Sequence, residues 1–205
     1  MISHKHKCIF VHIPKVAGQS IEMFFLDLHD LDWDSRHPLL LRPNDKPELG
    51  PPRLAHLKLH EYTSYNYLSA DLFEEYFKFT FVRNPWSRTV SFYKFEGYNE
   101  IMSFKMFVRK ELPKLINEKN WFYAPQYDFI YLENRTKSDF IGRFEDLHND
   151  FSTVCKKLGI PFTRLPHHNK SEIGKARGKL TKQKKSIRNI PARLLSNGRD
   201  KINSD

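Results

Sequence analysis

A short apolar run near the amino end of the chain stops abruptly and turns into a helical pattern. Residues 9–13 are mainly apolar, Pro14 and Lys15 end the run, and Gly18 and Ser20 lead into a segment of helical spacing. This order predicts a strand, a loop and a helix whose first backbone N–H groups face the loop. Such groups, together with a lysine and a hydroxyl, suit a phosphate or sulfate.

The loop differs from the phosphate loop of common ATPases and kinases. The pattern Gly-x-x-x-x-Gly-Lys-Ser/Thr is absent, and Lys15 precedes Gly18 instead of following a glycine. The sequence therefore disfavours a nucleotide kinase or an ATPase.

A second strand-to-helix turn follows at residues 79–93. An alternating apolar strand ends at Arg83, and Asn84 and Pro85 supply an N-cap and a first-turn proline for a helix that carries Ser91. A guanidinium at the strand end and a hydroxyl two turns into the helix can hold one phosphate together, because arginine suits bidentate contacts with such groups. The two turns together predict an anion-binding site.

The two turns, taken in order, resemble those of the carbohydrate sulfotransferases of the Golgi type and their bacterial relatives. The resemblance rests on Ile-Pro-Lys-Val-Ala-Gly-Gln-Ser and on Phe-Val-Arg-Asn-Pro-Trp-Ser-Arg-Thr-Val-Ser-Phe-Tyr, and it continues through residues 139–147 and 165–171. In that family the first loop binds the 5′-phosphosulfate of 3′-phosphoadenosine 5′-phosphosulfate (PAPS), and the second element binds its 3′-phosphate. The donor-binding residues that the resemblance implies are Lys15, Ala17, Gly18, Gln19, Ser20, Arg83 and Ser91.

Alternating strand and helix patterns predict an α/β fold, and the resemblance implies a P-loop-like, three-layer domain. A central parallel β-sheet would be flanked by helices, with the donor at the carboxyl ends of its strands. We expect strands near residues 8–13, 53–57, 77–82, 128–133 and 139–143. We expect helices near residues 19–28, 69–76, 85–97, 103–117 and 145–158. The proline-rich residues 30–52 are expected to form an irregular excursion that shapes the acceptor cleft.

Sulfuryl transfer to a hydroxyl needs a positioned donor, a positive charge at the leaving oxygen and a base for the acceptor proton. Lys15 suits the second role, because a cation gains in effect as charge develops there. His56 is the candidate base, since histidine is matched to neutral pH and bacterial relatives carry a histidine at this place. His60 and Glu61, in the same segment, are the alternatives.

Other polar residues have predictions of a structural kind. His12 lies inside the first strand and is expected to pack against the loop or orient it, whereas Arg88 is expected to be exposed on its helix, facing acceptor or solvent. Cys8 and Cys155 are expected to be buried free thiols. No Cys/His spacing suits zinc, so no metal is expected.

The net charge of +10 is concentrated at the end of the chain. Residues 170–205 hold 11 Lys or Arg against 3 Asp or Glu, a net +8, which leaves 23 against 21 for residues 1–169. We therefore predict a sulfotransferase domain at residues 1–169 and a basic, flexible tail at residues 170–205. The tail could bind polyanions weakly, and the nearly neutral body argues against a specific nucleic-acid partner.

No segment is long enough to span a membrane, and residues 8–13 are too few for a signal-peptide core, so a cytoplasmic protein is expected. The acceptor is expected to be a hydroxyl on a saccharide. The alternative is a catalytically inactive nucleotide- or glycan-binding module of the same fold. This alternative arises because relatives finish with a tyrosine-rich helical segment that residues 170–205 do not match.

Overall fold

The computed structural model describes residues 1–118, 120–162 and 164–166. The predicted basic tail at residues 170–205, and most of the family-like stretch at residues 165–171, lie outside the described residues. The division into a domain and a tail therefore stays a prediction.

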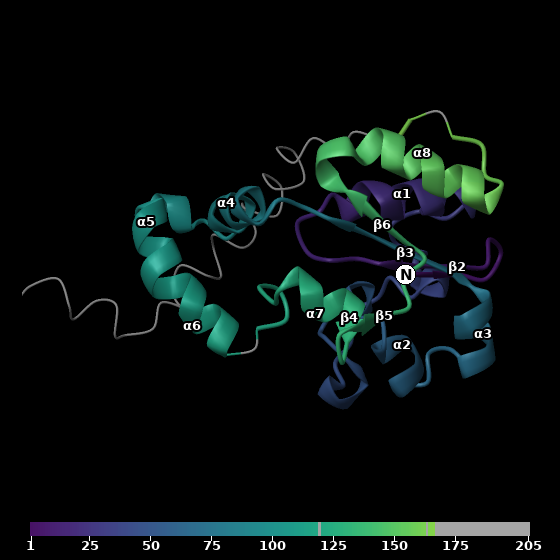
Figure 1. Ribbon diagram of the computed structural model, residues 1–205, viewed down its shortest axis with the longest axis horizontal. Helices are drawn as coiled ribbons and strands as arrows, with labels where there is room; N and C mark the ends of the chain where they lie inside the picture. Colours follow the sequence, from purple (N-terminus) through teal and green to yellow (C-terminus); the bar gives the residue numbers. More distant parts are fainter. Residues whose placement is uncertain (119, 163, 167–205) are drawn as a thin grey trace, which may run out of the picture. The chain divides into compact units, whose positions relative to one another are not determined.

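A four-stranded sheet forms the centre of the described part (Figure 1). Its strands, in spatial order, are β1 (Ile2–Ser3), β2 (Cys8–Val11), β3 (Phe77–Val82) and β6 (Phe140–Arg143). The last three run parallel, with Phe79 of β3 opposite Phe10 on one side and Phe140 on the other. The first strand, β1, pairs antiparallel with β2. The predicted α/β fold is confirmed. The sheet is mostly parallel, and it is mixed because of β1, a two-residue edge strand that no sequence pattern predicts.

Helices and short turns make up most of the remaining chain. The helices are α1 (Gly18–Leu28), α2 (Glu61–Ser64), α3 (Ala70–Glu75), α4 (Pro85–Phe95), α5 (Phe104–Met106), α6 (Leu112–Asn117), α7 (Gln126–Ile130) and α8 (Leu147–Leu158). Single 3₁₀ turns lie at His37–Leu39, Pro47–Leu49, Leu54–His56, Tyr98–Glu100 and Phe144–Asp146, and a π turn lies at Phe107–Glu111. Two further strands, β4 (Tyr131–Leu132) and β5 (Arg135–Thr136), pair antiparallel as a separate ribbon.

Helices cover both faces of the sheet, as expected for a three-layer domain. Figure 1 shows α1 and α8 side by side over one face, where Phe24 of α1 meets Phe151 of α8 with ring centroids 5.0 Å apart. Helices α2 and α3 lie on the opposite side, and Tyr62 of α2 donates a hydrogen bond to the carbonyl of Phe10 at 3.1 Å. Burying an aromatic side chain of this size stabilises the fold by about 1.5–3 kcal/mol.

A second, smaller aromatic cluster lies around α4 and the residues that follow it. Phe92, Phe107 and Tyr123 are its buried members. Half-buried neighbours, including Tyr98 and Phe122, pack against them. Residues between α4 and α7 therefore have apolar contacts of their own in addition to the core under the sheet.

Local capping signals predict where helices begin and end. The Asn84 side chain accepts from the backbone N–H groups at the start of α4, and Pro85 opens that helix. Ser69 and Ser103 cap α3 and α5 in the same way. Gly159 ends α8 with a left-handed φ of 66°. The predicted start of the helix at Asn84 and Pro85 is confirmed, because such a signal depends only on residues within a few positions of the helix end.

Three predicted elements differ from the structure, one of them completely. The strand expected at residues 53–57 is the 3₁₀ turn Leu54–His56, which buries Leu54, and Arg53 just before it forms an isolated antiparallel bridge with Pro43. In the strand expected at residues 128–133, residues 128–130 instead end α7, which follows Pro125, and Tyr131–Leu132 forms β4. The helix expected at residues 103–117 is present from residue 104 to residue 117 but contains the π turn, near Pro113, which has no N–H to donate to the preceding turn.

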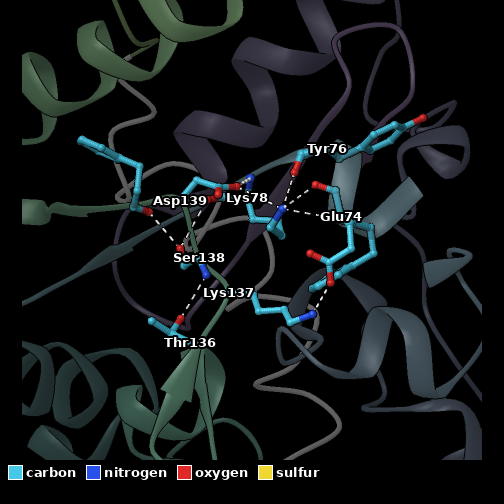
Figure 2. Close-up of polar contacts among 9 residues, drawn as sticks. Glu74, Tyr76, Lys78, Thr136, Lys137, Ser138 and Asp139 are labelled. Atoms are coloured by element: carbon cyan, nitrogen blue, oxygen red, sulfur yellow. Dashed lines mark hydrogen bonds and ion pairs between the residues drawn. The ribbon is translucent and has the colours of Figure 1, made fainter. Parts of the chain in front are cut away.

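A buried lysine ties three elements together at the amino end of β3 (Figure 2). Lys78 Nζ is bonded to the carbonyl oxygens of Phe73 and Tyr76 at 3.1 and 2.6 Å, at the end of α3. It is also 3.1 Å from Asp139 Oδ2, just before β6, and the same carboxylate oxygen accepts from the Lys78 backbone N–H at 2.7 Å. This cluster fixes the end of the sheet that faces away from the two strand-to-helix turns.

Candidate functional site

The first turn links β2 to α1 through strained backbone. Lys15 and Ala17 have left-handed φ values of 70° and 67°, a conformation that costs a residue with a side chain about 1–2 kcal/mol. Ala17 stands at the N-cap of α1 with no side-chain hydrogen bond to the helix, and the first turn of α1 contains no acidic residue. The first N–H groups of this 11-residue helix, three positions after Lys15, therefore suit a bound anion such as a phosphate or sulfate.

Gly18 is required by the histidine that packs against it. A Cβ atom at this position would lie 2.0 Å from His12 Cδ2, well inside contact distance. His12 is held there because its Nδ1 is hydrogen-bonded to Glu22 Oε1 of α1 at 2.5 Å, and both side chains are buried. His12 thus orients the loop, as its place in the sequence predicted.

The second turn meets the first through Arg83, which directly follows β3. Arg83 Nη1 donates to the carbonyl of Lys15 at 3.2 Å, and its Nε donates to Ser87 Oγ at 2.9 Å. Its backbone exchanges two 2.8 Å hydrogen bonds with the side chain of Gln126. The guanidinium also lies 4.1 Å from the ring centroid of Phe144, beyond β6. Three strand ends therefore converge on Arg83.

Arg88, on the first turns of α4, is buried, with 6% of its surface exposed. Its Nε donates to the carbonyl of Pro14 at 3.0 Å and its Nη1 to the carbonyl of Ala124 at 3.1 Å. Burial lowers the pKa of this guanidinium to about 10. The prediction of an exposed Arg88 is wrong, because the long side chain reaches the backbone of the first turn at Pro14, a contact between residues far apart in the sequence.

His56 reaches the same end of the sheet from its 3₁₀ turn. Its Nδ1 is 2.8 Å from the carbonyl of His12, and because a carbonyl can only accept, Nδ1 carries the proton. The lone pair of neutral His56 is therefore on Nε2, as a general base requires. Burial, helped by the nearby His12, lowers the pKa of His56 well below its ordinary value, which keeps the ring neutral at neutral pH.

A chain of aromatic contacts joins Lys15 to His56. Lys15 Nζ lies 3.5 Å from the ring centroid of Phe95, which is 63% exposed. Phe95 and Trp121 each meet the ring of Phe122, with centroids 5.7 and 5.5 Å apart. The Trp121 centroid is 5.0 Å from that of His56. Aromatic rings thus connect the two candidate catalytic side chains.

Most of the predicted residues lie around the two turns. Arg83 is bonded to Lys15, while His56 and Gly18 both contact His12, and Ala17 stands between Lys15 and Gly18 in the first turn. Gln19 and Ser20 lie on the first turn of α1.

Three predicted residues are less closely involved. The second candidate phosphate ligand, Ser91, is half-buried on α4 and has no side-chain hydrogen bond within residues 1–118, 120–162 and 164–166. The alternative bases lie beside α2, where Glu61 caps the turn by accepting from the backbone N–H of Lys58 and His60 is the N-cap of the helix. The role of each of these residues stays a prediction.

Several contacts at the site carried no sequence signal. Gln126, Trp121 and Phe95 belong to segments without a motif, and Glu22 was an ordinary helix position. The burial of Arg88 could have been predicted, because it lies one helical turn before the apolar Phe92 and therefore on the same face of the helix.

The described residues contain neither a metal-binding cluster nor a membrane-spanning helix. No group of three or more His, Cys, Asp or Glu residues there is arranged to hold a metal ion. No helix in the same part of the chain is long and apolar enough to cross a membrane. Cys8 and Cys155 are buried free thiols, as predicted.

Comparisons with known proteins identify the family of this chain. A family model described as "Sulfotransferase family" matches residues 1–202. An uncharacterized protein of Archaeoglobus fulgidus is 36% identical over 103 residues, which cover 47% of this chain and 78% of that protein. No solved structure matches the chain significantly.

Proposed function

The chain belongs to the sulfotransferase family, and we propose that it moves a sulfuryl group from PAPS to a hydroxyl of a carbohydrate. The observation that carries the proposal is the junction of the two turns, where Arg83 bonds the carbonyl of Lys15 while His56 bonds the carbonyl of His12. One end of the sheet thereby combines a helix N-terminus, two cations and a neutral imidazole. These are the groups that sulfuryl transfer needs.

The first turn would hold the 5′ side of the donor. The backbone N–H groups of residues 17–20 and the Nζ of Lys15 would bind the 5′-phosphosulfate, and PAPS supplies the sulfuryl group when it is bound. Lys15 would add positive charge at the leaving oxygen, where it has its greatest effect as negative charge develops. The strained Lys15 and Ala17 support this role, because such backbone conformations are concentrated at ligand sites.

The second turn would hold the 3′-phosphate. Arg83 and Ser91 are the proposed ligands, and Arg83 already lies against the first turn through Lys15. A rotation of its side chain away from Ser87 would free Nε for a phosphate oxygen. This arrangement would distinguish a 3′-phosphorylated nucleotide from an ordinary one.

His56 would take the proton from the acceptor hydroxyl at Nε2. The bond from Nδ1 to His12 fixes the ring and its tautomer, so each attack would find the lone pair in the same place. The aromatic contacts from Phe95 to Trp121 support a carbohydrate acceptor, because the C–H face of a sugar ring packs well on aromatic rings.

Calorimetry with 3′-phosphoadenosine 5′-phosphate (PAP) and AMP tests donor recognition. We expect PAP to bind far more tightly than AMP, and Arg83→Ala to weaken PAP binding by about 1.5–3 kcal/mol, the value of a hydrogen bond to a charged group. Arg135→Ala, at an exposed arginine of β5, is the matched control and should leave affinity unchanged. Equal affinity for PAP and AMP would contradict the assignment of the second turn.

Transfer itself is tested with sulfur-35-labelled PAPS and a panel of polysaccharides, lipids and small alcohols. Label incorporated into a polysaccharide, and lost with His56→Ala, is the expected result. Tight PAP binding without transfer to any member of the panel would favour the inactive nucleotide-binding module instead.

A further inference from the structure

The guanidinium of Arg88 bridges two segments that come from distant parts of the sequence. Its Nε donates to the carbonyl of Pro14, and its Nη1 donates to the carbonyl of Ala124. The group is planar and rigid, so the positions of these two nitrogens fix the spacing between the two carbonyls. Arg88 therefore sets how far the donor loop lies from the segment that ends at Ala124.

Each of the two carbonyls belongs to a segment that reaches a proposed catalytic residue. Pro14 directly precedes Lys15, whose φ is left-handed. Ala124 follows the turn that carries Trp121, and the Trp121 ring meets His56. Arg88 thus contacts the backbone beside Lys15, on the proposed donor side of the site, and the segment that carries Trp121, on the proposed acceptor side.

Stability alone does not account for Arg88. Its third nitrogen, Nη2, is buried without a hydrogen-bond partner among the described residues. A buried donor left unpaired costs about 1–3 kcal/mol, which a smaller donor or an apolar side chain at this position would avoid. The strained backbone at Lys15 must also be held by its surroundings, and Arg88 and Arg83 bond consecutive carbonyls, those of Pro14 and Lys15.

We propose that Arg88 is a positioning residue of the transfer reaction, which holds the Pro14 carbonyl so that Lys15 meets the 5′ group of the donor. The inference rests on the proposed function, since it assigns Arg88 to the binding of the same nucleotide. Arg88 acts through Lys15, and the bond to Ala124 anchors the guanidinium to the acceptor side. A lysine cannot replace it, because a single ammonium lacks the planar fork that spans both carbonyls.

A double-mutant cycle on PAP binding tests the coupling. Calorimetry is run on the full chain as wild type, Lys15→Ala, Arg88→Lys and the double variant. We expect Lys15→Ala to weaken PAP binding at least about tenfold in the wild type, as for loss of a charged hydrogen bond, but less than about threefold in the Arg88→Lys background. Such non-additivity is the sign that one residue acts through the other.

Two further variants exclude a merely structural effect. Lys78→Met perturbs the other buried cation, and in this background Lys15→Ala should keep its full effect on PAP affinity. Arg88→Gln, which retains amide donors, takes the place of Arg88→Lys if the lysine variant does not fold.

The outcomes separate the inference from the proposed function. Additive effects of Lys15→Ala and Arg88→Lys would overturn the positioning role while leaving donor binding intact. A cycle that is equally non-additive with Lys78→Met would also overturn it, because general loosening would then explain the result. Failure of the wild type to bind PAP would overturn the proposed function and the inference together.

Discussion

Two buried cations, on β3 and just beyond it, are satisfied in different ways. Lys78, at the amino end of β3, is bonded to the backbone at the end of α3 and to Asp139 (Figure 2). Arg88 lies beyond the carboxyl end of β3. One of its buried nitrogens has no hydrogen-bond partner in the described part of the chain, and another donates to the carbonyl of Pro14, next to the strained Lys15. The paired cation serves the fold, whereas the incompletely paired one lies where we propose the chemistry. Local rules are broken at functional sites more often than elsewhere.

The largest effect that tests this contrast is expected from His56→Ala. Turnover should fall by roughly 10²–10⁴-fold, the usual contribution of a general base, while PAP affinity stays nearly unchanged because our proposal places His56 on the acceptor and not on the nucleotide. Sulfur-35 transfer and calorimetry on the same preparations measure the two quantities. His60→Ala is the matched control, and a dead His60 variant beside an active His56 variant would move the role of base to His60.

Lys78→Met should produce the largest loss of stability without a loss of PAP binding. The substitution leaves the carbonyls at the end of α3 without their charged donor, which we expect to lower the free energy of unfolding by about 2–3 kcal/mol. Urea denaturation measures this change. Lys137→Met, at a neighbouring exposed lysine that pairs with Glu74, should change stability by less than about 1 kcal/mol. If the two variants lost equal free energy of unfolding, Lys78 would be no more important for stability than an exposed lysine.

A smaller effect concerns pH, because burial lowers the pKa of His56 in the folded state. Below the unfolded-state pKa of about 6.5, the unfolded chain binds a proton at this residue that the folded chain does not. As the pH is lowered below about 6.5, the free energy of unfolding should therefore decrease, by up to about 1.4 kcal/mol per pH unit for His56. Comparison with His56→Gln isolates this contribution from those of His6 and His29, whose pKa values burial also lowers.

The smallest effect is expected from Phe95→Ala. The exposed contact between Lys15 and Phe95 is worth about 0.5–1 kcal/mol, so stability and PAP affinity should each change by no more than that. Acceptor use should respond more, with a raised KM for any saccharide found in the transfer assay. Trp86→Ala, at the exposed tryptophan of the same helix, is the control. A large loss of PAP affinity in the Phe95 variant would mean that the ring belongs to the donor site.

Both strand-to-helix turns could be predicted because their signals are local. The apolar alternation of residues 77–82 gives β3 with the bounds it has in the structure. Asn84 and Pro85 predict the start of α4, and Lys15 and Gly18 predict the turn before α1. Each signal depends on residues within one helical turn, so no knowledge of the tertiary structure is needed.

The other half of the candidate site could not be predicted, because it consists of contacts between distant residues. Arg88 lies 74 positions from Pro14, and Arg83 lies 43 from Gln126. Residues 53–57 illustrate the opposite error, since a short run with two leucines resembles a strand but here packs into the core from a turn. Burial against a remote segment decided the outcome in each case.

The separate aromatic cluster around Phe92, Phe107 and Tyr123 has a consequence for how such an enzyme could diversify. Residues between α4 and α7 pack largely on one another. At the end of this segment, Ala124 accepts a hydrogen bond from Arg88 and Gln126 donates one to the backbone of Arg83. Mutations within the segment could therefore accumulate without disturbing nucleotide recognition. New acceptors would be acquired by exchanging one contiguous stretch of chain, and protein engineers could recombine that stretch between relatives at the same two anchor points.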